Sequence, residues 1–145
     1  MNEPVNAQAE TMWQADRASR GLGMHLDEVA PGRARLAMTI TEAMTNGHGI
    51  CHGGFIFSLA DSAMAFASNQ HGDVVVAQHA AITFVRPGRI GETLVAEAVE
   101  RMRAGRSGMC DVRVRTADGD LVAEFRGHTR MLRGGTKTEA TDGGT

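Results

Sequence analysis

The sequence predicts an α+β fold in which one antiparallel β-sheet wraps around one long central helix. The first observation is a continuous apolar segment, residues 55–69, whose hydrophobic side chains recur with helical spacing. The second is that strand-like segments flank it without alternating with helices, as they would in a doubly wound parallel sheet. The chain has 145 residues, of which 42% are hydrophobic, enough for one buried core. We therefore expect a single domain over residues 1–145, with its core at about 21–133.

One carboxylate interrupts the apolar central segment. Asp61 lies on the border between a wide hydrophobic arc and a narrow stripe of small residues on the opposite side, formed by Ser58, Ser62, Ala65 and Asn69. A helix this apolar is typical of a buried central helix, and at roughly 15 residues it is too short to span a bilayer. Burying a carboxylate costs on the order of several kcal/mol unless it is paired, hydrated or used in chemistry. Asp61 is therefore a candidate functional residue, with a buried structural acid as the alternative.

The remaining elements follow in chain order. Residues 7–20 are predicted to form an amphipathic helix that ends at Gly21-Leu22-Gly23. Residues 24–29 and 34–40 are predicted strands joined at Pro31-Gly32, and the second alternates apolar and polar residues as a half-buried antiparallel strand does.

Four more predicted strands follow the central helix. They cover residues 74–85, 93–102, 109–116 and 121–132, and Asp118-Gly119 is a hairpin signal between the last two. The polar, glycine- and threonine-rich residues 134–145 are expected to be a disordered tail.

Composition excludes several functions. With two cysteines, nine methionines and no basic, apolar leader, the chain is expected to be cytoplasmic. A net charge of −2, one tryptophan and no tyrosine argue against nucleic-acid binding. His48, Cys51 and His52 do not match a standard zinc spacing, so no metal is expected. Because the central helix is too short to span a bilayer, no membrane partner is expected.

The start of the central helix is suited to polarising a carbonyl. Gly53 and Gly54 offer backbone N–H groups at the positive end of a helix dipole, and the lack of side chains lets a carbonyl approach. Thioester hydrolysis needs such donors together with a base or nucleophile, and Asp61 could supply either. Eight residues of helix separate Gly53 from Asp61, which is about 12 Å at about 1.5 Å per residue. If both act on one carbon, the site must be shared between the subunits of a two-fold dimer.

The segment NGHGICHGGFIFSLADSAMAFA, residues 46–67, resembles the signature of the phenylacetic-acid-pathway acyl-CoA thioesterases of the PaaI type. The likeness extends from about Gly21 to residue 136 and includes residues 82–88 and 125–127. It implies a hotdog fold and hydrolysis of (hydroxy)phenylacetyl-CoA-like aryl thioesters, with coenzyme A as part of the substrate and no cofactor. By resemblance Asp61 is the catalytic carboxylate, Gly53 the carbonyl-polarising donor, and His52 and Asn46 supporting polar residues.

Some relatives add a serine or threonine beside the carboxylate. In this chain the corresponding positions are Ala65, one helical turn after Asp61, or Ala77, Gln78 and His79 on the following strand. The sequence leaves open which of them, if any, takes that role.

Candidate substrate-binding residues surround the helix. Gly54, Phe57, Met64 and Ala65 are placed to line an acyl pocket, and Arg86 and Arg89 to bind coenzyme A phosphates. The arginines at 101, 103, 106, 113 and 115 fit a solvated strand face better than a phosphate site. We expect a homodimer, further paired into a homotetramer. The alternatives are a hotdog hydratase or dehydratase with a histidine base, against which Asp61 argues, and a non-catalytic acyl-CoA-binding module.

Overall fold

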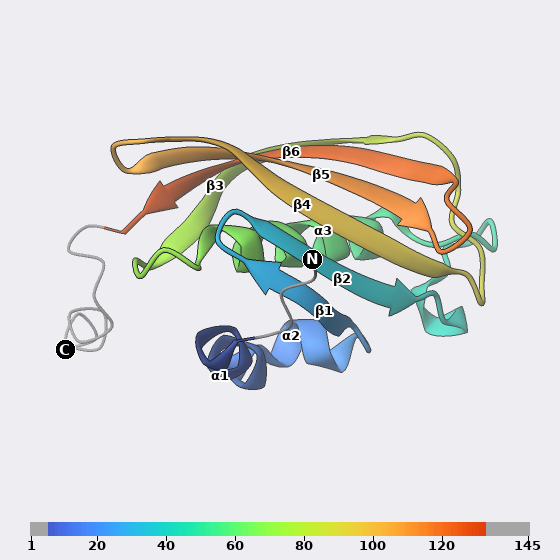
Figure 1. Ribbon diagram of the computed structural model, residues 1–145. Helices are drawn as coiled ribbons and strands as arrows, with labels where there is room; N and C mark the ends of the chain where they lie inside the picture. Colours follow the sequence, from blue (N-terminus) through green and yellow to red (C-terminus); the bar gives the residue numbers. More distant parts are fainter. Residues whose placement is uncertain (1–5, 133–145) are drawn as a thin grey trace, which may run out of the picture.

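A computed structural model describes residues 6–132 and confirms the predicted arrangement of one antiparallel sheet around one central helix. Figure 1 shows the sheet curving over helix α3, with α1 and α2 below β1 at the bottom of the view. Trp13 of α1 packs on Phe66 of α3, so this end of the chain lies against the central helix. The sheet has six strands in the order β1-β2-β4-β5-β6-β3. In chain order the elements are α1 (Ala7–Ala15), α2 (Arg17–Gly21), β1 (His25–Ala30), β2 (Arg33–Thr39), η1 (Glu42–Met44), α3 (Gly53–Ser68), β3 (Val75–Phe84), β4 (Thr93–Ala104), β5 (Ser107–Thr116) and β6 (Leu121–Met131).

Helix α3 begins two residues before the predicted start and continues unbroken for 16 residues. Its N-cap is His52, and at its end the Asn69 N–H donates to the Ala65 carbonyl over 3.1 Å. The predicted apolar arc is the buried face, except that Phe55 is only half-buried. That face packs against the apolar inward side chains of β2, β4 and β5, so helix and sheet share one core.

The N-terminal helix predicted over residues 7–20 is wrong as a single element. Asp16 leaves helical geometry (φ −87°, ψ 86°) and divides the segment into α1 and α2. Its N–H still donates to the Trp13 carbonyl, while its carboxylate accepts the Ser19 N–H over 2.9 Å. Asp16 therefore ends one helix and caps the next, as aspartate side chains favour.

The strands lie within a few residues of their predicted bounds. The β1–β2 turn contains Gly32 at φ +78°, a left-handed conformation that favours glycine. Strand β3 occupies one edge of the sheet, pairs only with β6, and has an irregular register between Ala77 and His79.

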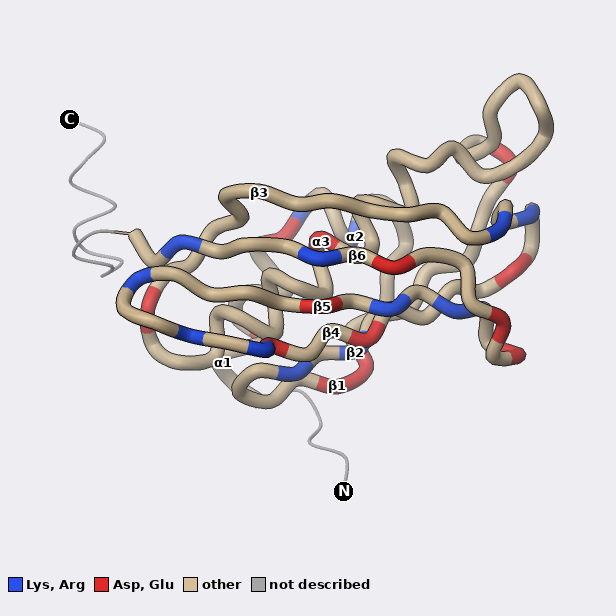
Figure 2. Tube along the Cα trace, turned by 90° about the horizontal axis from the view of Figure 1, so that it is seen from above, with Lys and Arg blue, Asp and Glu red and all other residues tan. Residues whose placement is uncertain are grey.

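The outer face of the sheet is covered by ion pairs. Figure 2 shows basic and acidic residues side by side on β4, β5 and β6, whereas β3 carries no Lys, Arg, Asp or Glu. Arg126 and Arg101 both bond the Asp111 carboxylate, and Arg113 donates to Glu124 over 2.8 Å. These pairs agree with the interpretation of the strand arginines as a solvated face.

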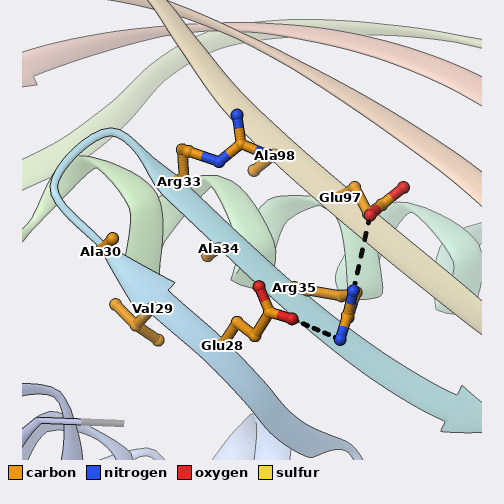
Figure 3. A pocket seen from close by; sticks show the side chains of 8 residues that line it. All are labelled: Glu28, Val29, Ala30, Arg33, Ala34, Arg35, Glu97 and Ala98. Carbon is orange, nitrogen blue, oxygen red and sulfur yellow. Dashed lines mark ion pairs between the residues drawn. The ribbon is translucent and has the colours of Figure 1, made fainter. Parts of the chain in front are cut away.

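A small cavity of about 90 Å³ lies between β1, β2 and β4. Figure 3 shows Arg35 there, paired with Glu28 and Glu97. No residue of α3 lines it, so it is separate from the predicted site. Among residues 6–132, no helix has the length and apolar character needed to cross a membrane. The tail predicted at 134–145 lies outside the described residues.

Candidate active site

The first turn of α3 holds one backbone donor without an acceptor. The Gly54 N–H donates to His52 Nδ1 over 2.9 Å, and the Phe55 N–H donates to the His52 carbonyl over 3.0 Å. The Gly53 N–H has no acceptor among the described residues. Of the two glycines considered from sequence, Gly53 is therefore the one whose N–H is free to meet a substrate carbonyl at the positive end of the helix.

His52 accepts the N–H groups of Gly54 and Phe55 and leaves that of Gly53 without an acceptor in the described part of the chain. Because its Nδ1 accepts a hydrogen bond, the proton of the neutral imidazole is assigned to Nε2. The ring is exposed, so Nε2–H is available as a further donor beside Gly53. Its backbone N–H donates to the Met44 carbonyl over 2.7 Å, which holds the residue in place at the N-terminus of α3.

Asn46 organises the loop that precedes the helix. Its side-chain oxygen accepts the N–H groups of His48 (2.9 Å) and Ile50 (3.4 Å), and its own N–H donates to the Ile50 carbonyl over 2.8 Å. An isolated antiparallel bridge between Thr45 and Cys51 closes this loop against the helix start. Asn46 therefore shapes the backbone of the loop that leads to the helix start.

Asp61 lies two turns further along the same helix. Its side chain is half-buried, and its carboxylate makes no hydrogen bond to any described residue. Burial raises the pKa of Asp61, and the nearby Asp16 carboxylate raises it further by like-charge repulsion. A carboxylate without a hydrogen-bonding partner keeps its lone pairs for water or a carbonyl carbon.

A polar network beside Asp61 was missed by sequence reasoning. Ser62 Oγ lies 2.7 Å from Ser19 Oγ, which in turn donates to the Asp16 carboxylate over 2.7 Å. Ser19 is 2% exposed. Its hydrogen bond with Ser62 joins the junction of α1 and α2 to α3 at the position directly after Asp61. The helix-capping pattern Asp16-x-x-Ser19 was the local signal, but nothing local pairs it with Ser62.

The predicted acyl-pocket residues differ in accessibility. Phe57 is half-buried and packs edge-to-face on Phe125, with ring centroids 5.2 Å apart. Met64 is 1% exposed and packs against Gly127, where a side chain would have no room. Ala65 is half-buried on the small-residue stripe, and on β3 the positions Ala77, Gln78 and His79 are exposed.

The two predicted phosphate-binding arginines also differ. Arg86 donates to both carboxylate oxygens of Glu92, over 3.1 and 2.9 Å, and lies 3.5 Å from Asp120. These acids hold the pKa of Arg86 above its usual value. Arg89 is exposed and has no ion pair among residues 6–132. Of the two, Arg86 is held in an ion pair within the described residues and Arg89 is not.

Both cysteines are buried free thiols. Burial, with added repulsion from Glu100, raises the pKa of Cys110 to about 12, so it is a poor nucleophile. Burial also raises the pKa of Cys51. Within residues 6–132, no three His, Cys, Asp or Glu side chains are grouped to hold a metal ion.

The structure thus brings Gly53, Gly54 and His52 together and joins Asn46 to them through the loop. Asp61 remains about 12 Å away along the unbroken helix, at about 1.5 Å per residue. A free donor at a glycine-rich helix start and an unpaired carboxylate on the central helix are the two kinds of group that thioester hydrolysis requires.

Comparison with known proteins agrees with this class. The family profile of the thioesterase superfamily matches residues 48–123. Acyl-coenzyme A thioesterase PaaI of Escherichia coli (strain K12) is 40% identical over 130 residues, 90% of this chain and 92% of that protein. Human acyl-coenzyme A thioesterase 13 is 30% identical over 91% of this chain and 96% of that protein.

Solved structures give the same result. Escherichia coli PaaI, described as a protein of the phenylacetic acid degradation operon, superposes with a TM-score of 0.84 at 39% identity, covering 86% of this chain and 90% of that one. A variant of the phenylacetic acid degradation protein PaaI of Thermus thermophilus gives 0.78 at 37% identity, covering 81% and 100%. The chain belongs to the thioesterase superfamily and is a thioester hydrolase of the hotdog fold, similar to the PaaI type of acyl-CoA thioesterase.

Proposed function

We propose that this protein is a cytoplasmic acyl-CoA thioesterase that hydrolyses (hydroxy)phenylacetyl-CoA-like aryl thioesters to the free acid and coenzyme A. The name of the Escherichia coli relative, and the operon from which it is described, support the substrate class. The half-exposed aromatic side chain of Phe57, packed on Phe125, supports an acyl pocket that accepts a ring.

In the proposed reaction the Gly53 N–H donates to the thioester carbonyl oxygen as negative charge develops on it. Asp61 acts in one of two ways. As a base it removes a proton from water, whose oxygen bonds to the carbonyl carbon. As a nucleophile it bonds to that carbon itself, and water then hydrolyses the resulting anhydride. In both cases the carbon–sulfur bond breaks and the coenzyme A thiolate takes up a proton.

The proposed site is shared between two subunits of a homodimer, because one chain holds its donor and its carboxylate about 12 Å apart along α3, at about 1.5 Å per residue. Edge strand β3 is a suitable interface. It has unpaired backbone groups on its outer side, no charged residue, and exposed apolar side chains at Val76 (43%), Ala77 and Ala81. Two copies of β3 related by a two-fold axis would extend the sheet. We further propose that two dimers pair into a homotetramer, which light scattering can test.

The observation that carries the proposal is the unpaired Asp61 carboxylate on the same helix as the free Gly53 donor. The test is Asp61→Asn, which keeps the shape and removes the charge. We expect turnover of phenylacetyl-CoA to fall by roughly 10²-fold or more, with an unchanged circular dichroism spectrum. Asp118→Asn, which removes the same charge from an exposed turn, is the control and should retain activity. Near-normal turnover in purified Asp61→Asn would refute the assignment.

A substrate panel followed by release of the free thiol tests the acyl group. We expect a higher kcat/KM for phenylacetyl-CoA and hydroxyphenylacetyl-CoA than for straight-chain acyl-CoA of similar size. A preference for straight chains would refute the aryl assignment. Binding of acyl-CoA with no thiol release from any member of the panel would identify a non-catalytic binding module.

A further inference from the structure

The ring of Phe84 lies directly on the backbone of Gly53. A Cβ atom added to Gly53 would lie 2.8 Å from Cζ of Phe84 and 3.2 Å from each of its two Cε atoms, closer than ordinary contact. The tip of the ring therefore faces the Cα of Gly53. The contact joins the last residue of β3 to the first residue of α3, 31 positions apart in the chain.

This contact places an accessible aromatic surface beside the free donor. The Gly53 N–H has no acceptor among residues 6–132, and its nitrogen is bonded to the Cα that the ring covers. Phe84 is nevertheless 49% exposed, so much of the ring remains uncovered. A carbonyl that accepts from this N–H on the side of Phe84 brings its neighbouring atoms close to the ring. Apolar walls around a few placed polar groups are the usual construction of ligand sites.

We propose that Phe84 is a substrate-contacting specificity residue: its ring forms the wall of the carbonyl-binding site at Gly53 and packs on the apolar atoms next to the thioester. Glycine at position 53 leaves free the space that this ring occupies. The inference rests on the proposed function and extends it to a residue outside the helix signature.

Three variants test the contact. Gly53→Ala keeps the N–H but places a methyl group against the ring, and because the ring is half-exposed it can turn outward while the fold persists. Phe84→Ala removes the wall itself. We expect each variant to raise KM for phenylacetyl-CoA by about tenfold with little change in kcat, as loss of a contact made equally in ground and transition states does. Because both remove one contact, Gly53→Ala combined with Phe84→Ala should raise KM no further.

The control is Met102→Ala, which removes a similarly exposed apolar side chain (44%) from β4, away from the helix start, and should leave KM unchanged. An unchanged KM in Phe84→Ala would overturn the inference, as would a double variant whose KM rises by the product of the two single effects. A loss of kcat with KM unchanged would assign Phe84 a structural role and would also overturn it.

Failure of the inference is distinguishable from failure of the proposed function. If the wild-type protein released no thiol, the proposed function would fail, and the same variants would then be compared by equilibrium binding of a non-hydrolysable thioether analogue of phenylacetyl-CoA. The wall at Phe84 predicts weaker binding by about tenfold in Phe84→Ala. Equal binding by wild-type protein and Phe84→Ala would reject the wall in that case too.

Discussion

The carboxylate of Asp61 is held in a partly apolar environment without a hydrogen-bonding partner among the described residues. Burial and the neighbouring Asp16 both favour its protonated form, and both raise its pKa. Only the ionised form can act as base or nucleophile. With Asp61 in its proposed role, we therefore expect this pKa to set the acid limb of activity, where turnover falls as pH decreases and Asp61 takes up a proton.

Asp16 should shift the pH of that acid limb through its effect on the pKa of Asp61, without contacting the substrate. Asp16→Asn removes the second cause of the raised pKa but keeps an oxygen that can accept the Ser19 N–H, so α2 stays capped. The pKa of Asp61 should then fall, and the acid limb of kcat should move to lower pH. A pH–rate profile measures the shift. Asp118→Asn should leave the profile in place, and an equal shift in both variants would contradict a local effect of Asp16.

Arg86 and Arg89 differ in whether their charge is available to bind a phosphate of coenzyme A. The charge of Arg86 is neutralised by Glu92, whereas Arg89 has no ion pair among the described residues. If Arg89 binds a phosphate of coenzyme A, Arg89→Gln should raise KM for acyl-CoA by about tenfold. KM for a pantetheine thioester, which lacks the nucleotide phosphates, should not change. Equal effects on both substrates would exclude a phosphate contact.

At the scale of elements, the start of α3 is built around one unused donor. A matched pair of substitutions isolates it, because Gly53→Ala and Gly53→Pro both place a Cβ against Phe84 but only proline removes the N–H. Proline is tolerated in the first helical turn, so both variants should fold. We expect turnover by Gly53→Pro to be lower than that by Gly53→Ala by on the order of 10²-fold. Equal turnover by two folded variants would show that another group polarises the carbonyl.

The elements also show what the sequence could and could not predict. The strong helical period of the central segment places Gly53 and Asp61 on one helix, and alternation identifies the inward faces of β2 and β4. The division of the N-terminal helix depends on whether the Asp16 side chain caps α2, which helical periodicity does not report. The contacts of Phe84 with Gly53 and of Ser62 with Ser19 join residues 31 and 43 positions apart, so only the folded sheet and helix bring them together.

At the scale of the whole molecule, the charged residues of the sheet are separated from its β3 edge. The outer face carries ion pairs such as Arg113 with Glu124, which at this exposure contribute little to stability but keep the face hydrated. Strand β3 has no charge to oppose pairing with another strand, and Gly53 lies against its last residue. A partner subunit bound along β3 would therefore lie next to the free donor.

Subunit complementation tests whether the site is shared. Asp61→Asn and Gly53→Pro are each expected to be nearly inactive as homodimers. If donor and carboxylate come from different chains, a mixed dimer has one site with both defects and one with neither. A 1:1 mixture after random exchange should regain about a quarter of wild-type activity, since half of the dimers are mixed and each has one intact site. Sites built within one chain would all stay defective, so no activity would return. Exchange itself is verified with differently tagged chains, and a strictly monomeric, fully active protein would refute the shared site.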